Sequence, residues 1–130
     1  MSGVSCCLIE TLGEKETLAR HKKILLEFAQ KRDLNVVEIY EEVVSGESIE
    51  SRIEVKRLLK DVQLRKYRSV IVMEIERLAR GATKDQGIIM EAFKYSETLI
   101  ATPTKTYDPN NPSDEEMLEM GLFFSRREYK

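Results

Sequence analysis

The sequence predicts an α/β domain in which a mostly parallel β-sheet carries helices on both faces. Short stretches rich in apolar and β-branched residues alternate along the chain with longer stretches whose apolar residues recur at helical spacing. Strands that alternate with helices of this length form βαβ units, which give parallel strands. The 130 residues, 42% of them hydrophobic and 34% charged, have the size and composition of one globular domain. We therefore expect a single domain over residues 1–130.

The first half of the chain contains two predicted strands and two predicted helices. Residues 3–9 are apolar and suited to a strand. Thr17 is a candidate N-cap for a helix over about residues 16–32, whose apolar residues lie three and four positions apart. Residues 36–40 form the next strand, and a helix over residues 51–64 follows it. The predicted apolar stripe of that helix consists of Ile53, Leu58, Leu59 and Val62.

The second half continues the alternation. Residues 69–75 are mostly apolar, as expected for a buried central strand, and a helix over residues 84–95 and a strand over residues 98–101 follow. An irregular loop is marked by Pro103, Pro109 and Pro112. A long C-terminal helix begins at about residue 113 and is expected to be truncated at the chain's end, because no stop signal follows. Core packing and a partner-helix face both remain open for its apolar stripe, which comprises Met117, Met120, Leu122, Phe123 and Phe124.

Charge and cysteine content exclude several classes of protein. The net charge of −2 gives little domain-wide attraction to nucleic acid, so a self-sufficient DNA-binding module is not expected. Neither a membrane span nor a secretory signal is visible. Cys6 and Cys7 are neighbours in a predicted strand and point to opposite faces, which argues against a disulfide or a shared metal site. Since His21 is the only histidine, a structural zinc site is excluded, and free thiols suit the cytoplasm.

Two segments after predicted strands carry arginines that could bind an anion. In parallel sheets, ligands bind beyond the carboxyl ends of the strands. Arg77 and Arg80 follow the most apolar strand and lie three residues apart, so in a helical turn they share a face and suit a phosphate group. Arg52 follows the second strand and precedes a helix, where anions also bind. The alternatives are a solvated surface pair for the first segment and an ordinary loop and cap for the second.

The hydroxyl and imidazole side chains give weaker evidence of a catalytic site than the arginines do. A hydroxyl nucleophile needs activation and stabilisation of the leaving charge. Ser5 lies in the first predicted strand, and a lone serine is usually structural. His21 could act as a base, but a single histidine on an amphipathic helix is more often a surface or packing residue.

Five short motifs follow one another along the chain, namely Val43–Ser48, Ser51–Arg52, Leu58–Val62, Val70–Val72 and Glu76–Gly81. Their order resembles the catalytic domain of the resolvase/invertase family of serine site-specific DNA recombinases. Similarity to the large serine recombinases of phages and mobile elements is carried by Thr17–His21, Ala101–Pro103, Thr106–Pro109 and Phe124–Glu128. Each motif is short, but their order over about residues 16–130 makes the resemblance specific.

The resemblance implies a resolvase-like fold and a chemistry that needs no metal, nucleotide or other cofactor. In this family a serine attacks a DNA phosphodiester, forms a 5′-phosphoserine link and frees a 3′-hydroxyl. The resemblance assigns Arg52, Arg77 and Arg80 to the scissile phosphate, and Glu76 to the acidic position before the arginine pair. It also implies DNA as a partner, with specific binding by domains beyond the last helix, and dimers that pair into tetramers through that helix.

The amino-terminal segment departs from the family pattern, in which an arginine, one residue and the nucleophilic serine follow the first strand. In one register Ser5 is that serine, but Gly3 replaces the arginine and no strand precedes it. In the other register Val4 to Ile9 is itself the first strand, and Glu10 or Thr11 stands in the nucleophile's place. Fold stability favours the second register, so Ser5 is a conditional nucleophile and the domain is either active or catalytically impaired.

Two alternative functions come from other classes. One is a non-catalytic α/β module that oligomerises or regulates. The other is a flavodoxin-like phosphate or nucleotide binder, which the absence of a glycine-rich phosphate loop disfavours.

Overall fold

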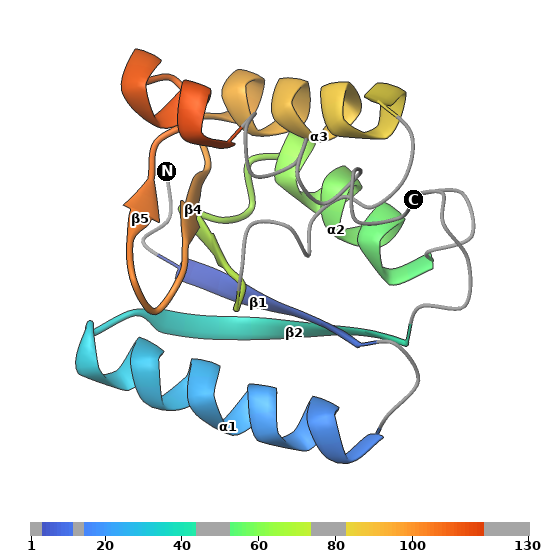
Figure 1. Ribbon diagram of the computed structural model, residues 1–130, viewed down its shortest axis with the longest axis vertical. Helices are drawn as coiled ribbons and strands as arrows, with labels where there is room; N and C mark the ends of the chain where they lie inside the picture. The colour runs from blue at the N-terminus through green and yellow to red at the C-terminus, as the bar shows by residue number, and fades with distance from the viewer. Residues whose placement is uncertain (1–3, 12–14, 44–52, 74–82, 119–130) are drawn as a thin grey trace.

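A computed structural model describes residues 4–11, 15–43, 53–73 and 83–118 of the chain (Figure 1). Its helices and strands, in chain order, are β1 (Val4–Thr11), α1 (Lys15–Lys31), β2 (Asn35–Val43), α2 (Ile53–Gln63), β3 (Ser69–Ile71), α3 (Thr83–Ser96), β4 (Leu99–Ala101) and β5 (Thr106–Tyr107). A further helical segment covers residues 112–118. No helix in the described part of the chain is both long and apolar enough to span a membrane.

The strands form one five-stranded sheet in the order β2-β1-β3-β4-β5. The first four pair in parallel, and β5 runs antiparallel to β4 at one edge. β1 is an inner strand, with β2 on one side and β3 on the other. The predicted fold class is therefore confirmed.

Helices cover both faces of the sheet, with α1 on one face and α2 and α3 on the other (Figure 1). Consecutive side chains of a strand point to opposite faces, and the residues of β1 show this directly. Cys6 and Leu8 belong to the core under α2 and α3, whereas Cys7 and Ile9 belong to the core under α1. All four side chains are almost fully buried. The predicted separation of the two cysteines is confirmed, and both thiols are free.

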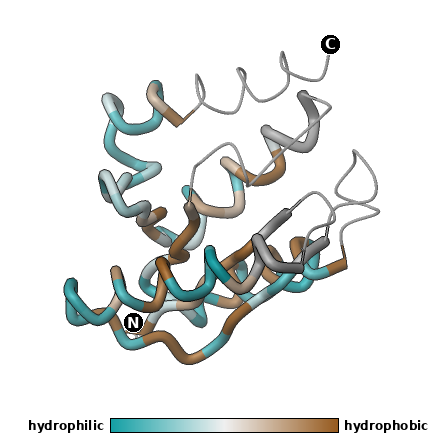
Figure 2. The backbone as a smooth tube through the Cα atoms, turned by 60° about the horizontal axis from the view of Figure 1, so that its bottom comes forward, coloured by the Kyte–Doolittle hydropathy of each residue, from teal (hydrophilic) through white to brown (hydrophobic). Residues whose placement is uncertain are grey.

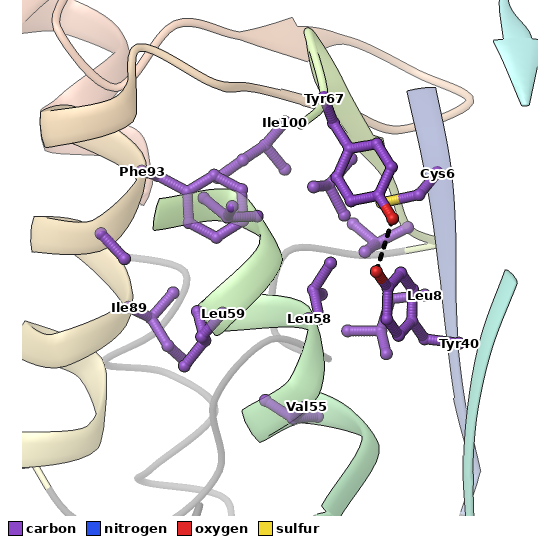
Figure 3. Packing of buried hydrophobic residues seen from close by; sticks show 14 of the residues in the cluster. Cys6, Leu8, Tyr40, Val55, Leu58, Leu59, Tyr67, Ile89, Phe93 and Ile100 are labelled. Carbon is purple, nitrogen blue, oxygen red and sulfur yellow. Dashed lines mark hydrogen bonds between the residues drawn. The ribbon is translucent and has the colours of Figure 1, made fainter. Parts of the chain in front are cut away.

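The larger core lies between α2, α3 and the sheet (Figure 3). Four residues of α2 are buried in it, namely Val55, Leu58, Leu59 and Val62. Burying side chains of this size stabilises the fold by about 1.5–3 kcal/mol each. The tube in Figure 2 alternates between hydrophobic and hydrophilic residues along the helices, as expected where one helical face is buried. The prediction that Ile53 joins the apolar stripe is wrong, because Ile53 is the first residue of α2 and 72% exposed.

Helices α1, α2 and α3 each end in the same type of turn, and none of these turns contains a glycine. The residues with positive φ in these turns are Asp33 (60°), Arg65 (58°) and Glu97 (58°). After α1, the amide of Leu34 donates to the carbonyl of Ala29 at 2.8 Å, a bond that closes the last helical turn. Equivalent bonds close α2 and α3. The left-handed residue turns each helix directly into the next strand.

Strand β5 was not predicted, because its two residues lie in the proline-containing stretch assigned to a loop. A polar turn brings it back onto β4: the Thr102 hydroxyl donates to the carbonyl of Lys105 at 2.8 Å and accepts from its amide at 3.1 Å. Beyond this hairpin, residues 112–118 begin the predicted C-terminal helix. Met117 is 46% exposed while the adjacent Leu118 is buried, so the helix contributes to the core on one side. The rest of its predicted apolar stripe lies outside the described residues.

Candidate functional site

Three segments of the chain start at one edge of the sheet. Strands β1, β2 and β3 are parallel and adjacent, so their carboxyl ends point to the same edge. Thr11, the last residue of β1, pairs with Val43, the last residue of β2. The segments that follow these three strands are residues 12–14, 44–52 and 74–82. In open parallel sheets this edge is where ligands bind.

Four of the predicted site residues belong to these segments. Arg52, Glu76, Arg77 and Arg80 lie outside the described residues, and their roles stay predictions. The topology nevertheless relates their segments: one starts at the carboxyl end of β2 and the other follows β3, with β1 between these two strands. The first segment also ends where α2 begins, since Arg52 is followed by Ile53.

Ser5 lies at the opposite, amino-terminal end of β1. It pairs with Val36 of β2 and with Ser69 of β3, and it is 1% exposed. Its Oγ lies 2.6 Å from Oγ of Ser69, so one hydroxyl donates to the other. Thr11 is six residues further along the strand, which corresponds to about 20 Å. Of the two sequence registers, the structure has the one in which Val4 to Ile9 is itself the first strand.

The cysteine thiols and the histidine do not provide an evident nucleophile and base. Burial raises the pKa of Cys7 to about 12 and that of Cys6 further still, and the neighbouring thiol adds to the shift at Cys6. Both thiols therefore stay protonated at neutral pH, and a protonated thiol is a poor nucleophile. His21 lies in α1, partly exposed, on the face of the sheet that α1 covers.

A buried polar network, which sequence reasoning missed, joins β2, α2 and the start of β3. The Tyr40 hydroxyl donates to Oδ2 of Asp61 at 2.5 Å and lies 2.5 Å from the Tyr67 hydroxyl (Figure 3). Lys66 Nζ lies 3.0 Å from Oδ1 of Asp61. These residues are 21 and 27 positions apart in the sequence, so no local motif marks them. The tyrosine at the end of the predicted strand over residues 36–40 was the only available signal.

The network fixes the charge states of its members. Burial raises the pKa of Tyr40, and the hydrogen bonds to Asp61 and Tyr67 raise it further, so Tyr40 remains a neutral donor. Burial alone would raise the pKa of Asp61. Hydrogen bonds from Tyr40 and Lys66, with the positive charges of Lys66 and Arg57, outweigh burial and lower it. Asp61 is therefore a carboxylate at neutral pH.

Arg57 ties the first turns of α2 to β2. Its Nη2 lies 2.7 Å from Oε1 of Glu54, its Nη1 lies 3.6 Å from Oε2 of Glu38, and its guanidinium lies over the Tyr40 ring. The hydrogen bond to Glu54 raises the pKa of Arg57, which stays charged. Segment 44–52 leaves β2 and enters α2, so these contacts hold the two elements at its ends in a fixed relation.

Comparisons with known proteins point to one family. Residues 10–129 match the profile of the family described as "Resolvase, N terminal domain". The match includes Arg52, Glu76, Arg77 and Arg80 and leaves Ser5 outside.

Solved structures show the same fold. The N-terminal catalytic domain of TP901-1 integrase superposes with a TM-score of 0.70 at 13% identity, covering 92% of this chain and 92% of that chain. The C-terminal catalytic domain of ISC1926 TnpA, an IS607-like serine recombinase, gives 0.67 at 22% identity, covering 89% and 75%. A resolvase family site-specific recombinase from Streptococcus pneumoniae gives 0.67 at 20% identity, covering 91% and 83%.

Proposed function

The chain belongs to the resolvase N-terminal domain family, and from that premise we propose that it breaks and rejoins DNA strands in site-specific recombination through a 5′-phosphoserine intermediate. The observation that carries the proposal is topological. Strands β1, β2 and β3 deliver their carboxyl ends to one edge of the sheet, and the arginine-bearing segments follow two of those ends. DNA is the partner that this chemistry requires.

In the proposed reaction a hydroxyl oxygen attacks a backbone phosphorus, and the bond to the 3′ oxygen breaks. The attacking hydroxyl loses its proton, and the departing oxygen gains one to become the free 3′-hydroxyl. Rejoining reverses these steps with a new 3′-hydroxyl. Such phosphoryl transfer depends on positioning and on stabilising negative charge, which arginines supply.

Arg52, Arg77 and Arg80 hold the scissile phosphate in this proposal, and Glu76 occupies the acidic position before the arginine pair. Removal of a donor that stabilises a transition-state oxyanion costs about 3–4 kcal/mol, or a rate loss of roughly 100- to 1000-fold. Each arginine replaced by alanine is expected to produce a loss of this size.

The position of Ser5 favours a second candidate function, a non-catalytic module that oligomerises or regulates. A nucleophile must reach the phosphate, yet Ser5 is buried and bonded to Ser69 at the amino-terminal end of β1. Thr11 is the hydroxyl-bearing residue at the carboxyl end of the same strand. An active domain would therefore use Ser5 only after local rearrangement, or would use another hydroxyl.

One experiment separates these possibilities. The protein at its full natural length is incubated with labelled duplexes that tile the DNA flanking its gene, and covalent protein–DNA adducts are separated on a denaturing gel. An adduct that folded Ser5→Ala protein no longer forms, and whose modified peptide in the unsubstituted protein maps to Ser5, identifies Ser5 as the nucleophile. An adduct that survives Ser5→Ala but is lost in Thr11→Val, with the modified peptide mapped by mass spectrometry, assigns the role to Thr11. No adduct from folded protein that binds the duplexes contradicts the proposed catalysis and favours the non-catalytic module.

A further inference from the structure

The outward face of α2 carries two lysines that form no ion pair with an acidic residue in the described part of the chain. Lys56 and Lys60 are both exposed and lie four residues apart, one helical turn along the axis. The structure gives neither an ion pair with any residue that it describes. The two acidic residues of α2 are already engaged, Glu54 by Arg57 and Asp61 by Lys66.

Several other basic residues in the described part of the chain are paired, whereas Lys23 and Lys31 of α1 are exposed without an ion pair there but lie eight residues apart. Ion pairs join Lys22 to Glu41, Lys94 to Glu115 and Lys105 to Asp114. With a net charge of −2, the domain as a whole does not attract a polyanion, so any such attraction is local. The α2 face is a local positive surface of this kind.

Packing fixes the direction in which this surface points. The opposite side of α2 is buried through Val55, Leu58, Leu59 and Val62, so the helix cannot turn its lysines inward without exposing core. The contacts of Arg57 with Glu54 and Glu38 also hold the flank of the helix next to β2. Lys56 and Lys60 therefore remain in solvent beside one another.

The surface also adjoins the proposed reaction site along the chain. Arg52, Lys56 and Lys60 recur every four residues in the sequence, and Arg52 immediately precedes α2. The ammonium group of an exposed lysine is a compact, strongly hydrated charge. Such a group suits contact with a backbone phosphate, which does not depend on the base sequence. Duplex DNA carries phosphates at regular intervals along its axis. A duplex bound by Arg52 at one phosphate therefore presents further phosphates to the neighbouring lysines.

We propose that Lys56 and Lys60 bind DNA backbone phosphates that flank the one held by Arg52, which makes the outer face of α2 a DNA-contacting surface. The inference rests on the proposed function for the identity of the polyanion. Because the contacts are electrostatic and independent of sequence, they contribute to affinity and to its salt dependence rather than to site choice.

The test is the salt dependence of binding to a fluorescent duplex of arbitrary sequence, measured by anisotropy over a series of low salt concentrations. Each phosphate contact contributes about 0.9 to the slope of log K against log salt, so Lys56→Gln/Lys60→Gln is expected to lower that slope by about 1.8. The matched control is Lys23→Gln/Lys31→Gln, which removes two exposed lysines from α1 on the other face of the sheet. Its slope is expected to equal that of the unsubstituted protein.

Each possible result of the binding measurement either supports or contradicts the inference. An unchanged slope in the α2 variant, equal losses in both variants, or no duplex binding by the unsubstituted protein overturns the inference. Circular dichroism verifies that both variants are folded. The adduct assay tests the catalysis separately. If an adduct forms but the α2 variant has the same salt slope as the unsubstituted protein, only this inference is contradicted. If the α2 variant has a smaller slope and no adduct forms, the DNA-contacting surface is supported and the proposed catalysis is contradicted.

Discussion

The guanidinium carbon of Arg57 lies 4.3 Å from the centre of the Tyr40 ring, and this stacking joins α2 to β2. The same guanidinium bonds Glu54 within α2 and faces Glu38 of β2. Segment 44–52 is thereby bounded by two elements that a single side chain ties together.

Replacement of Arg57 by alanine is expected to lower the free energy of unfolding by about 1 kcal/mol. A partly exposed cation–π contact contributes about 0.5–1 kcal/mol, and the ion pairs add little because both partners are partly exposed to solvent. Chemical denaturation with urea measures the change. Lys56→Ala, at the adjacent exposed position, serves as the control and should stay within about 0.5 kcal/mol of the parent. Equal losses in the two variants would show that Arg57 has no special role.

Tyr40→Phe is expected to destabilise the protein by about 1–3 kcal/mol. The substitution keeps the ring but removes the hydroxyl that donates to Asp61 and pairs with Tyr67. It leaves the buried Tyr67 hydroxyl without this partner, while Asp61 keeps its ion pair with Lys66. Tyr67→Phe should cost less, because the bond between Tyr40 and Asp61 survives. The double variant measures the coupling, and strictly additive losses would contradict a shared network.

The stability contributed by Asp61 should depend on pH in the acid range. Its pKa in the folded protein is lowered below the ordinary aspartate value of about 3.9, so the carboxylate favours the folded state above that pH. The contribution is lost as the pH falls through the folded-state pKa. Unfolding free energies measured from neutral to acid pH should therefore fall less steeply in Asp61→Asn. Parallel curves for the two proteins would refute the assignment.

Glu97→Gly is expected to stabilise the fold by up to about 1 kcal/mol. A left-handed backbone costs a non-glycine residue roughly 1–2 kcal/mol, which glycine avoids at some entropic cost in the unfolded chain. Thermal unfolding reports the gain, and Glu97→Ala, which keeps the strain, should show none. Arg65 is a poorer site for the same change, because its guanidinium also lies over the Tyr95 ring and donates to the Tyr95 carbonyl.

Ser5→Ala is expected to cost about 1–3 kcal/mol, because it leaves the buried Ser69 hydroxyl without its partner. Removing both hydroxyls in Ser5→Ala/Ser69→Ala should restore most of that loss. Urea denaturation of the single and double variants provides the comparison. Equal losses in both would indicate that the pair is not coupled.

The sequence was sufficient to predict the parallel sheet, because helical and strand periodicities alternate clearly along the chain. The structure removed the ambiguity at the amino terminus, since pairing of β1 with β2 and β3 defines which residues are the strand. Ile53 was placed wrongly because a helix-start residue can satisfy the periodicity and still lie outside the core. The ends of α2 and α3 lacked the usual glycine, so the left-handed turns at Arg65 and Glu97 gave no local signal.

The candidate site was predictable only in part. Arginine-bearing motifs after strands are local patterns, and the strand order brings the starts of their segments to one edge. The network of Tyr40, Asp61 and Tyr67 depends on contacts between distant parts of the chain, which no single-sequence pattern specifies. The position of Ser5 depends on strand register, which adjacent apolar residues leave open until the pairing is known.

The placement of Cys6 and Cys7 on opposite faces of β1 gives the protein two internal probes of local opening of its helical layers. Each thiol becomes available to an alkylating reagent only when the helical layer over its own face separates from the sheet. The order in which the two are modified would therefore reveal whether the α1 layer or the layer formed by α2 and α3 loosens first, without any added probe.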